Sequence, residues 1–377
     1  METPVIVEAM RTPQGKDGGV FADVRSEDLS IPLVNEILAE TGLTSADVDD
    51  LMWGVAGQRG EQDNNLARVI ALLSDLGEGV PGATINRWCA SSMQAVMSAS
   101  DAIRAGQRDC VIVGGVENMS RTPMQGADRE LHPKLAEEYV ITDLLMGMTA
   151  EEVAERYDVP REVQDEYAAK SQQRAVAATE DGRYAEEILP IETDDGTITQ
   201  DEGLRPGTTK EKLAELPSVF VGDGTVTAGN ASQISDGAAA LLVTSESFAD
   251  DHGLEVMAEV GDNNVAGVDP TVMGIGPVPA TRGLLERTGR EIDDYDLVDL
   301  NEAFASQAVY SRDELGIDPE IFNVNGGAIA IGHPLGASGA RLPVTLIHEL
   351  GRRGGGRGLA TLCVGFGQGA AIDFVVR

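Results

Sequence analysis

The sequence predicts an α/β protein in which helices cover a buried sheet, and three observations support this fold class. Short runs rich in β-branched residues alternate with helix-like stretches up to about residue 117, and this rhythm returns from about Asp236 to the C-terminus. Several segments of these two regions resemble each other in the same order. The chain has 377 residues, 42 % of them hydrophobic, which is enough to bury a large core.

The first region contains successive strand and helix patterns that fit βαβ units. Strands are expected at residues 5–7, 51–55, 83–86 and 111–113, and helices at 28–40, 65–73 and 91–105. The later region repeats the pattern with strands at 297–300 and 359–362 and a helix that begins near Ala340. This alternation is typical of a layered fold with a buried sheet.

Residues 118–230 have a different character, with many charges, helical patterns at 150–156 and 161–179, and an acidic, turn-rich segment at 192–202. We interpret this stretch as an inserted, more exposed domain. The predicted division is therefore an N-terminal half made of residues 1–117 and 231–253, an inserted domain at 118–230, and a C-terminal half at 254–377.

Three pairs of segments indicate that the two halves arose by duplication. They lie roughly 240 to 250 residues apart and occur in the same order. The pairs are Asp47–Trp53 with Asp294–Leu300, Ala83–Asn86 with Phe322–Asn325, and Cys110–Gly115 with Leu362–Gly365. An active site between two such halves would take residues from both.

The charge balance excludes some partners. Lys and Arg number 28 against 63 Asp and Glu, a formal net charge of −35, and only five of the basic residues are lysines. Such a surface argues against nucleic-acid binding, which requires a basic face, and against docking on anionic membranes. Because counterions relieve self-repulsion of this size, we predict a protein adapted to a salty cytoplasm. The alternative is an ordinary acidic cytosolic enzyme.

The sequence offers no signal for export or membrane insertion. The longest apolar runs, such as residues 238–243, are far too short to cross a bilayer. The chain leads almost directly into the strand at 5–7 without a charged and then apolar leader. Three cysteines in a chain of this length do not form a disulfide framework, so we expect a cytoplasmic protein.

Cys89 is the first candidate catalytic residue. It lies between the strand at 83–86 and the helix at 91–105. At such a turn, free backbone N–H groups and the helix dipole can stabilise a thiolate, and the same groups can hold a developing oxyanion. The alternative is a buried, inert cysteine.

His333 is the second candidate, within the glycine-rich segment Asn325–Gly339. Glycines allow the backbone to approach a ligand closely, and a histidine held there can transfer protons near neutral pH. The other three histidines, His132, His252 and His348, stand among charged residues and receive no role. Four scattered histidines do not form a metal site.

Cys363 and Asn301 complete the candidates found from the residues themselves. Cys363 ends a strand and opens the glycine-rich loop Cys363–Gly369, which lacks a phosphate-loop ending and instead suits a thiol that exchanges protons. Cys110 precedes the strand at 111–113 and is interpreted as a small packed hydrophobe. Asn301 follows the strand at 297–300, where capping of a helix N-terminus is its default role.

With these residues gathered, the sequence resembles the thiolase family over nearly its whole length. Four segments resemble the family's active-site signatures in its order and at its spacing, and a fifth is similar to its coenzyme A segment. The four are Asn86–Ser92, Asn301–Phe304, Gly332–Pro334 and Cys363–Gly367, and the fifth is Thr227–Ser232 with Asp236–Ala239.

The resemblance implies the thiolase fold, in which two duplicated βαβαβαββ halves form five layers (α-β-α-β-α) and carry an inserted loop domain. It also implies reversible acyl transfer between a 3-ketoacyl-CoA and coenzyme A through an acyl-Cys89 intermediate. In that scheme His333 deprotonates Cys89 and Cys363 exchanges the proton of the acetyl-CoA carbon. Asn301 holds a water facing the enolate oxygen, and the N–H groups of Cys89 and Gly365 face the tetrahedral oxygen.

The resemblance further implies that the inserted domain provides most of the coenzyme A site. Ser232 would contact the pantetheine, Met146 would cover the acyl end together with Phe304, and Arg205 would lie near the nucleotide. Lys212, and Lys210 beside it, form a local basic cluster that suits an anionic ligand, although they also fit as chance surface lysines. Coenzyme A and acyl-CoA are substrates here, and no permanently bound cofactor and no metal are expected.

Several functions remain open at this point. We expect a 3-ketoacyl-CoA thiolase of fatty-acid β-oxidation, and the alternative is an acetyl-CoA C-acetyltransferase that makes acetoacetyl-CoA for biosynthesis. A remote alternative is a non-catalytic acyl-CoA-binding scaffold. The expected assembly is a homodimer or homotetramer, which could associate with a dehydrogenase or hydratase of β-oxidation.

Overall fold

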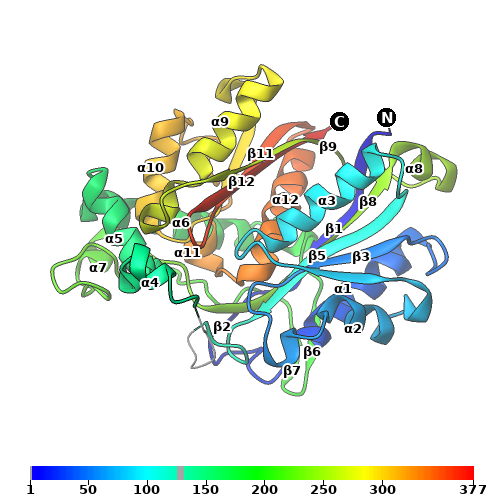
Figure 1. Ribbon diagram of the computed structural model, residues 1–377, viewed down its shortest axis with the longest axis horizontal. Coiled ribbons are helices and arrows are strands. Elements are labelled where there is room, and N and C mark those ends of the chain that lie inside the picture. The colour runs from blue at the N-terminus through cyan, green and yellow to red at the C-terminus, as the bar shows by residue number, and fades with distance from the viewer. Residues whose placement is uncertain (1, 125–130) are drawn as a thin grey trace.

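Strands and helices alternate along the N-terminal part of the chain in the order that the sequence predicts (Figure 1). The computed structural model describes residues 2–124 and 131–377. The predicted insertion at 118–230 includes residues 125–130, which lie outside these ranges. The first eight core elements are β1 (Pro4–Arg11), α1 (Ser26–Thr41), β3 (Asp50–Gly54), α2 (Leu66–Leu73), β4 (Gly82–Ile85), α3 (Ser91–Arg104), β5 (Cys110–Asn118) and β8 (Ser235–Ser245).

The C-terminal part repeats this order of elements with one difference. Where the first half has a complete third strand, the second has a single bridge between Val298 and Phe322. The elements are β9 (Ala258–Gly267), α9 (Pro277–Thr288), β10 (Leu297–Leu300), α10 (Ala305–Leu315), α12 (Leu335–Arg352), β11 (Gly356–Val364) and β12 (Gln368–Val376). The βαβαβαββ duplication expected from the sequence is therefore visible in the order of the elements.

The strands of the two halves join into one sheet. Its order is β10-β11-β12-β9-β1-β8-β5-β3-β4, and the short strand β2 (Gly15–Lys16) pairs with β8. The halves meet where β1 pairs with β9 over only two positions, Val5 with Glu259 and Ile6 with Ala258. The sheet is mixed, since β3 pairs in parallel with both β4 and β5, whereas β8 is antiparallel to its neighbours β1 and β5.

The helices form the layers that the fold class requires. Helices α3 and α12 pack together in the middle of the molecule, between the strands of the two halves (Figure 1). Apolar side chains of both helices and of strands from both halves form one central core cluster. Helices α1 and α2 cover the outer face of the first half, and α9 and α10 cover that of the second. The five-layer arrangement is confirmed.

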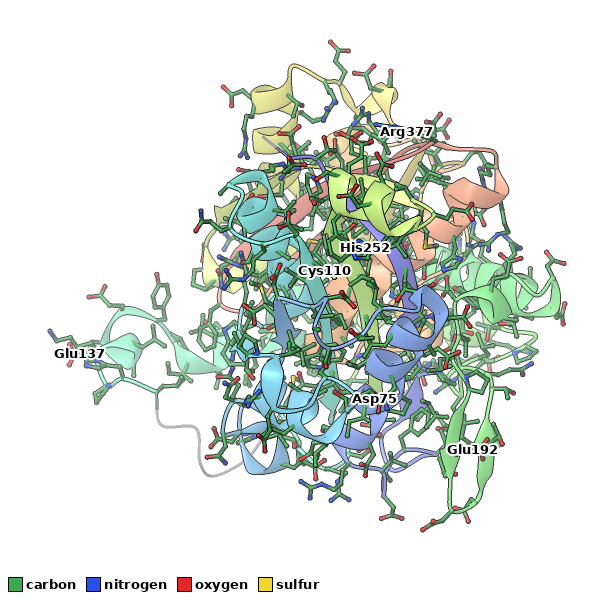
Figure 2. All side chains as sticks on the ribbon, turned by 90° about the vertical axis from the view of Figure 1, so that its right-hand side faces the viewer. Asp75, Cys110, Glu137, Glu192, His252 and Arg377 are labelled. Atoms are coloured by element: carbon green, nitrogen blue, oxygen red, sulfur yellow. The ribbon has the colours of Figure 1, made fainter. Side chains whose placement is uncertain are left out.

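The segment between β5 and β8 forms separate projections. Figure 2 shows Glu137 and Glu192 far apart, each on a part of the chain that extends from the body. The regular elements of the segment between β5 and β8 are α4 (Leu135–Glu138), α5 (Met146–Arg156), α6 (Arg161–Glu180), β6 (Ile191–Thr193), β7 (Gly196–Ile198) and α7 (Lys210–Ala214). The acidic stretch expected to consist of turns thus contains part of the two-stranded sheet β6-β7.

Buried polar contacts attach this segment to both halves. The Arg11 guanidinium at the end of β1 donates to Glu187 at 2.6 Å and to both carboxylate oxygens of Asp201. From α6, the hydroxyl groups of Tyr167 and Ser171 donate to the Glu302 carboxylate at 2.7 and 2.6 Å. A buried ion pair or carboxylate that loses one partner is strongly destabilised, so these contacts hold the inserted segment against the core.

The remaining short elements connect the layers. They are η1 (Gly60–Gln62), η2 (Gly77–Gly79), η3 (Ile141–Leu144), η4 (Tyr184–Glu186), α8 (Glu246–His252), η5 (Pro270–Ile275), η6 (Ile292–Asp294) and α11 (Ala328–Ile331). Along the described ranges, no helix is both long and apolar enough to pass through a bilayer.

Three helix starts were predicted wrongly. Helix α12 begins at Leu335 rather than near Ala340, and α5 begins at Met146 rather than at residue 150. Glycines in the first turns, Gly336 and Gly339 in α12 and Gly147 in α5, lower helix propensity and hide these starts from the sequence pattern. Close packing overrides this preference, because a Cβ on Gly147 would overlap the ring of Phe220. Helix α10 begins at Ala305, four residues after Asn301.

Candidate active site

Cys89 lies in a tight turn between β4 and α3. The side-chain oxygen of Asn86 accepts from the Trp88 N–H at 2.8 Å, and the hydroxyl of Ser91 accepts from the Arg87 N–H at 3.0 Å. Trp88 has a φ of 47°, in the left-handed region that a bulky residue adopts only when its surroundings require it. The turn thus places Cys89, a residue that is 7 % exposed, just before the N-terminus of α3.

The loop after Cys363 reaches the Cys89 thiol. Cys363 is the penultimate residue of β11, and the chain turns back into β12 through Phe366 and Gly367, whose φ angles are 61° and 75°. The backbone N–H of Gly365 forms a hydrogen bond with the Cys89 sulfur. The two cysteines, one from each half of the fold, therefore belong to one site.

Both thiols are protonated at neutral pH. Burial raises the pKa of Cys89 to about 11. The hydrogen bonds from the Gly365 N–H and from the N–H of Cys89 itself lower this pKa, but burial has the larger effect. Burial, with a further contribution from the nearby Cys89 sulfur, also raises the pKa of Cys363. A base is needed to make either sulfur nucleophilic.

Hydrogen bonds fix the ring of His333 and leave one of its nitrogens with a free lone pair. Its Nδ1 atom lies 2.6 Å from the Ser338 hydroxyl oxygen, and that hydroxyl donates to the Pro334 carbonyl at 2.8 Å. Because the single Ser338 proton is used there, His333 Nδ1 carries a hydrogen and donates to Ser338. The Nε2 atom then keeps its lone pair, 3.2 Å from the side-chain nitrogen of Asn301.

The imidazole of His333 is neutral. Burial lowers its pKa to about 3, and the positive charge of Arg341 in α12 contributes in the same direction. The Cys89 thiol and the His333 imidazole are therefore both uncharged at neutral pH. A neutral imidazole can accept the proton of a neutral thiol as the sulfur attacks a carbonyl carbon.

Asn301 does not cap a helix, so its default interpretation was wrong. The N-cap of α10 is Phe304, and the Asn301 side chain points instead to the His333 ring. Its main chain is fixed by a hydrogen bond from its N–H to the Thr361 carbonyl and by one from the Gln307 amide to its own carbonyl. The side-chain oxygen of Asn301 is buried and has no partner. Buried polar atoms of this kind usually bind water or a ligand.

Met146 and Phe304 lie close to Cys363, and Ser232 lies next to Phe304. Met146 and Phe304 share an apolar cluster with Cys363. A Cβ placed on Gly365 would lie 3.9 Å from the Met146 methyl carbon and 3.6 Å from Cγ of Trp88. The N–H of Ser232 donates to the Ala303 carbonyl at 3.0 Å, next to Phe304.

Arg205 and Lys212 lie together elsewhere on the surface of the inserted segment. Both are exposed, and Lys212 donates through its ammonium group to the Gly207 carbonyl, two residues from Arg205. Lys210 is paired with Glu166 at 2.8 Å. None of the contacts recorded for the described residues joins these cations to the cysteines or to His333.

Sequence reasoning missed three residues of the site. Ser338 and Glu117 contact the His333-bearing segment, and Phe220 meets Phe304 edge to face with ring centroids 6.4 Å apart. An acidic residue directly after the apolar run at 111–116 was a usable signal for Glu117. Phe220 stands in a segment without periodicity, so no signal was available.

The other histidines occupy separate places. His348 is half-buried and its Nε2 lies 2.9 Å from the Ala9 carbonyl, so its predicted surface setting was wrong. His252 stacks on Phe248 with ring centroids 3.9 Å apart. Over residues 2–124 and 131–377, no three His, Cys, Asp or Glu side chains gather where they could hold a metal ion.

The duplicated five-layer fold, with a cysteine from each half brought to one place and a His–Asn pair buried in the second half, defines a class of protein. The thiolase N-terminal domain model matches residues 4–247, and the thiolase C-terminal domain model matches residues 254–376. The chain belongs to the thiolase family.

Individual relatives are similar over the whole chain. A protein of Serratia proteamaculans named 3-ketoacyl-CoA thiolase is 46 % identical, with 99 % of each chain covered. The beta-ketoadipyl-CoA thiolase of Pseudomonas aeruginosa is also 46 % identical over 97 % of each chain. The structure of the Bacillus anthracis acetyl-CoA acetyltransferase matches with a TM-score of 0.92 and 40 % identity, and covers 100 % of this chain and 99 % of its own.

Proposed function

We propose that this protein is an acyltransferase that cleaves 3-ketoacyl-CoA with coenzyme A and also catalyses the reverse condensation. The observation that carries this proposal is the hydrogen bond from the Gly365 N–H to the Cys89 sulfur, which brings the loops of both cysteines to one point. The neutral His333 imidazole provides a base in the same site. The names of the relatives at 46 % identity support a degradative 3-ketoacyl-CoA thiolase.

In the first half-reaction, Cys89 is the nucleophile. His333 Nε2 takes the thiol proton while the sulfur attacks the 3-keto carbonyl carbon. The bond between carbons 2 and 3 breaks, and its electron pair forms the enolate of acetyl-CoA. Cys363 donates its proton to that enolate carbon, which leaves a Cys363 thiolate, a His333 imidazolium and an acyl group on Cys89.

In the second half-reaction, coenzyme A removes the acyl group. The Cys363 thiolate takes the proton of the coenzyme A thiol, and the resulting thiolate attacks the acyl carbon. Cys89 leaves as a thiolate and regains its proton from the His333 imidazolium, so both residues return to their resting state. Proton and charge balance close over the cycle without a further reactant.

Two oxyanions form in this scheme and need hydrogen-bond donors. We assign the N–H groups of Cys89 and Gly365 to the tetrahedral oxygen, since both already surround the Cys89 sulfur. We assign His333 and a water bound by the unpartnered oxygen of Asn301 to the enolate oxygen. Loss of one such donor typically slows the reaction by about 10²–10³-fold.

The coenzyme A site is proposed to lie mainly on the inserted domain at residues 118–230, between halves at 1–117 with 231–253 and at 254–377. Ser232 would contact the pantetheine, and Met146 and Phe304 would cover its reactive end. Arg205 and Lys212 would bind the phosphates at the nucleotide end, since an exposed pair of cations in an acidic chain attracts an anionic ligand.

Two cysteine variants test the division of roles. Cys89→Ser should abolish turnover and the burst of coenzyme A released on mixing with an acyl-CoA. Cys363→Ala should block thiolysis of acetoacetyl-CoA and condensation but still let Cys89 be acylated with release of coenzyme A, because the departing coenzyme A thiolate can take its proton from the His333 imidazolium instead of from Cys363. Loss of the burst in Cys363→Ala would contradict these roles, and absence of a burst in the unmodified protein would favour a non-catalytic scaffold.

An acetyl-CoA C-acetyltransferase that makes acetoacetyl-CoA is the second candidate, and one observation favours it. The rings of Trp88 and Phe366 pack with centroids 5.4 Å apart beside the Cys89 turn, where they would narrow the space for an acyl chain. Thiolysis rates on 3-ketoacyl-CoAs of four to sixteen carbons separate the two functions. Activity confined to the four-carbon substrate would identify the biosynthetic enzyme.

We also propose that the protein forms a homodimer or homotetramer. Strand β4 is an edge of the sheet, and on the adjacent helix α2 the side chains of Leu72 and Leu73 are 46 % and 62 % exposed. An open edge beside exposed leucines suits pairing with a second copy of the chain. Light scattering of the protein and of Leu73→Glu tests this proposal, which a wild-type monomer would contradict. Association with a β-oxidation dehydrogenase or hydratase would need a separate surface.

The proposed location is the cytoplasm. All three cysteines, at positions 89, 110 and 363, are free thiols, as is usual in a reducing compartment.

A further inference from the structure

A buried carboxylate that takes no part in the reaction scheme links the two halves next to the catalytic residues. Glu117, near the end of β5, is 1 % exposed. One of its oxygens accepts from the backbone N–H groups of Ala56 and Gly336, both at 2.9 Å. The other accepts from the Gly57 N–H at 3.0 Å and from the Gln62 side chain at 2.6 Å.

Burial raises the pKa of Glu117, but its hydrogen-bond partners lower it and favour the ionised form. The orientation of the Gln62 amide is fixed, because its oxygen accepts from the Asn118 N–H and the Ser26 hydroxyl, so its nitrogen faces Glu117. All four partners of the carboxylate are therefore N–H donors. A protonated carboxyl group would place its own hydrogen against one of them, whereas a carboxylate uses all four acceptor positions. The negative charge is held by hydrogen bonds without a cationic partner.

The contact with Gly336 crosses from one half of the fold to the other. Gly336 is the second residue of α12, three residues after His333, and α12 belongs to the C-terminal half. The backbones of β5 and α12 touch at this point, since a Cβ on Gly115 would overlap the Gly336 carbonyl. A second bond between the halves, from the Ala340 N–H to the Ser92 hydroxyl at 2.8 Å, joins α12 to the helix that follows Cys89.

The position of Glu117 also matters for charge. The free N–H groups at the start of α12 form the positive end of its dipole, close to His333. A positive end there disfavours an imidazolium, which His333 must become when it takes the Cys89 proton. The Glu117 carboxylate, bound to the Gly336 N–H, opposes that effect. The same negative charge makes ionisation of Cys89 harder.

Few other ionisable groups act on the Cys89 thiol or the His333 imidazole. Cys363 in β11 faces Cys89, and Arg341 in α12 acts on His333. Arg341 is in turn paired with Asp299 of β10 at 3.2 Å. Glu117 thus contributes a negative charge from the N-terminal half, and Arg341 contributes a positive charge from the C-terminal half.

We propose that Glu117 is a positioning residue for the reaction: its carboxylate holds the start of α12, and with it His333, against the half that carries Cys89, and it supports the positive charge that His333 acquires. This inference rests on the proposed function of His333 and Cys89.

The test compares Glu117→Gln, Glu117→Asp and Glu349→Gln in the full-length protein. Glu349 is a matched control because it is also a buried carboxylate. It belongs to α12 and is bound to Arg352 and Arg353, at the end of that helix away from Gly336. Two rates are measured: alkylation of Cys89 by iodoacetamide as a function of pH, located by mass spectrometry, and acylation of Cys89 by acetyl-CoA.

Glu117→Gln should move the midpoint of Cys89 alkylation to lower pH by about one unit, because the charge that opposes thiolate formation is gone. Acylation by acetyl-CoA should nevertheless slow by about 10- to 100-fold, as is common when a residue that orients a catalytic group is lost. Glu117→Asp keeps the charge and should keep the wild-type midpoint while restoring part of the acylation rate. Glu349→Gln should lower the melting temperature and leave the midpoint unchanged.

Two results would overturn the inference. One is an alkylation midpoint in Glu117→Gln that equals the wild-type value. The other is a shift in Glu117→Asp as large as that in Glu117→Gln. If Glu117→Gln does not fold, a midpoint in Glu117→Asp that is lower than the wild-type value by about one unit overturns the inference instead. If the wild-type protein is not acylated at all, the proposed function fails and with it the positioning role of Glu117, whereas the alkylation midpoints still show whether the Glu117 charge acts on the Cys89 thiol.

Discussion

The side-chain nitrogen of Asn301 lies 3.2 Å from Nε2 of His333, the ring atom that keeps its lone pair. Asn301 follows β10 and His333 precedes α12, so two segments of the C-terminal half place an amide and an imidazole side by side. The Asn301 oxygen, buried without a partner, remains available for a water molecule. In the proposed mechanism, Asn301 therefore contacts the base through its side-chain nitrogen and supports the water that stabilises the enolate through its side-chain oxygen.

Replacement of Asn301 by alanine tests that link. Asn301→Ala should slow acetoacetyl-CoA thiolysis by about 10²–10³-fold, because the water that faces the enolate oxygen loses its support. The initial rate of Cys89 alkylation should stay near the wild-type value, because the substitution does not change the ionisation of the Cys89 thiol. Thiolysis within twofold of wild type would show that Asn301 does not act on the enolate.

Ser338 should determine which nitrogen of His333 is the base. In Ser338→Ala the Nδ1–H group loses its acceptor at 2.6 Å, so the ring is free to adopt the other tautomer. Acylation of Cys89 should slow by about 10- to 100-fold. Nitrogen NMR of labelled histidine should show a hydrogen on Nδ1 in the wild-type protein and a mixture of tautomers in the variant. A wild-type hydrogen on Nε2 would contradict the assignment.

The lowered pKa of His333 predicts how stability depends on pH. Between its ordinary value of 6.5 and about 3, the unfolded chain binds a proton on His333 that the folded protein does not bind. Stability from this residue is therefore complete above pH 6.5 and is lost as the pH falls, by about 2 kcal/mol at pH 5. Urea unfolding of wild type and His333→Asn at pH 7.5 and pH 5 measures it. An equal pH dependence in both proteins would mean that His333 titrates normally.

The net charge of −35 predicts that salt stabilises the fold. Screening shortens the reach of repulsion between surface carboxylates from about 10 Å at 0.1 M salt to about 3 Å at 1 M. The melting temperature should therefore rise steadily across a KCl series from 0.05 to 2 M, and activity should follow it. Full stability in dilute buffer would contradict adaptation to a salty cytoplasm.

Much of the site could be predicted from local sequence. Cys89, His333 and Cys363 each stand at a strand end or in a glycine-rich turn. Such turns can be recognised from the neighbouring residues alone. The order of strands and helices in both halves was predictable for the same reason, because the alternation of apolar and polar residues is a property of neighbouring positions. A change in that pattern led to the prediction of an inserted domain at 118–230.

Only the tertiary structure decided the states and partners of these groups. Asn301, which the sequence suggested as a helix cap, lies beside His333. Glu117 accepts a hydrogen bond from Gly336, which is 219 positions away in the chain. The neutral forms of Cys89 and His333 follow from their depth between layers that come from both halves. Burial and contacts between distant segments set pKa values and hydrogen-bond partners, and neither quantity is a property of adjacent residues.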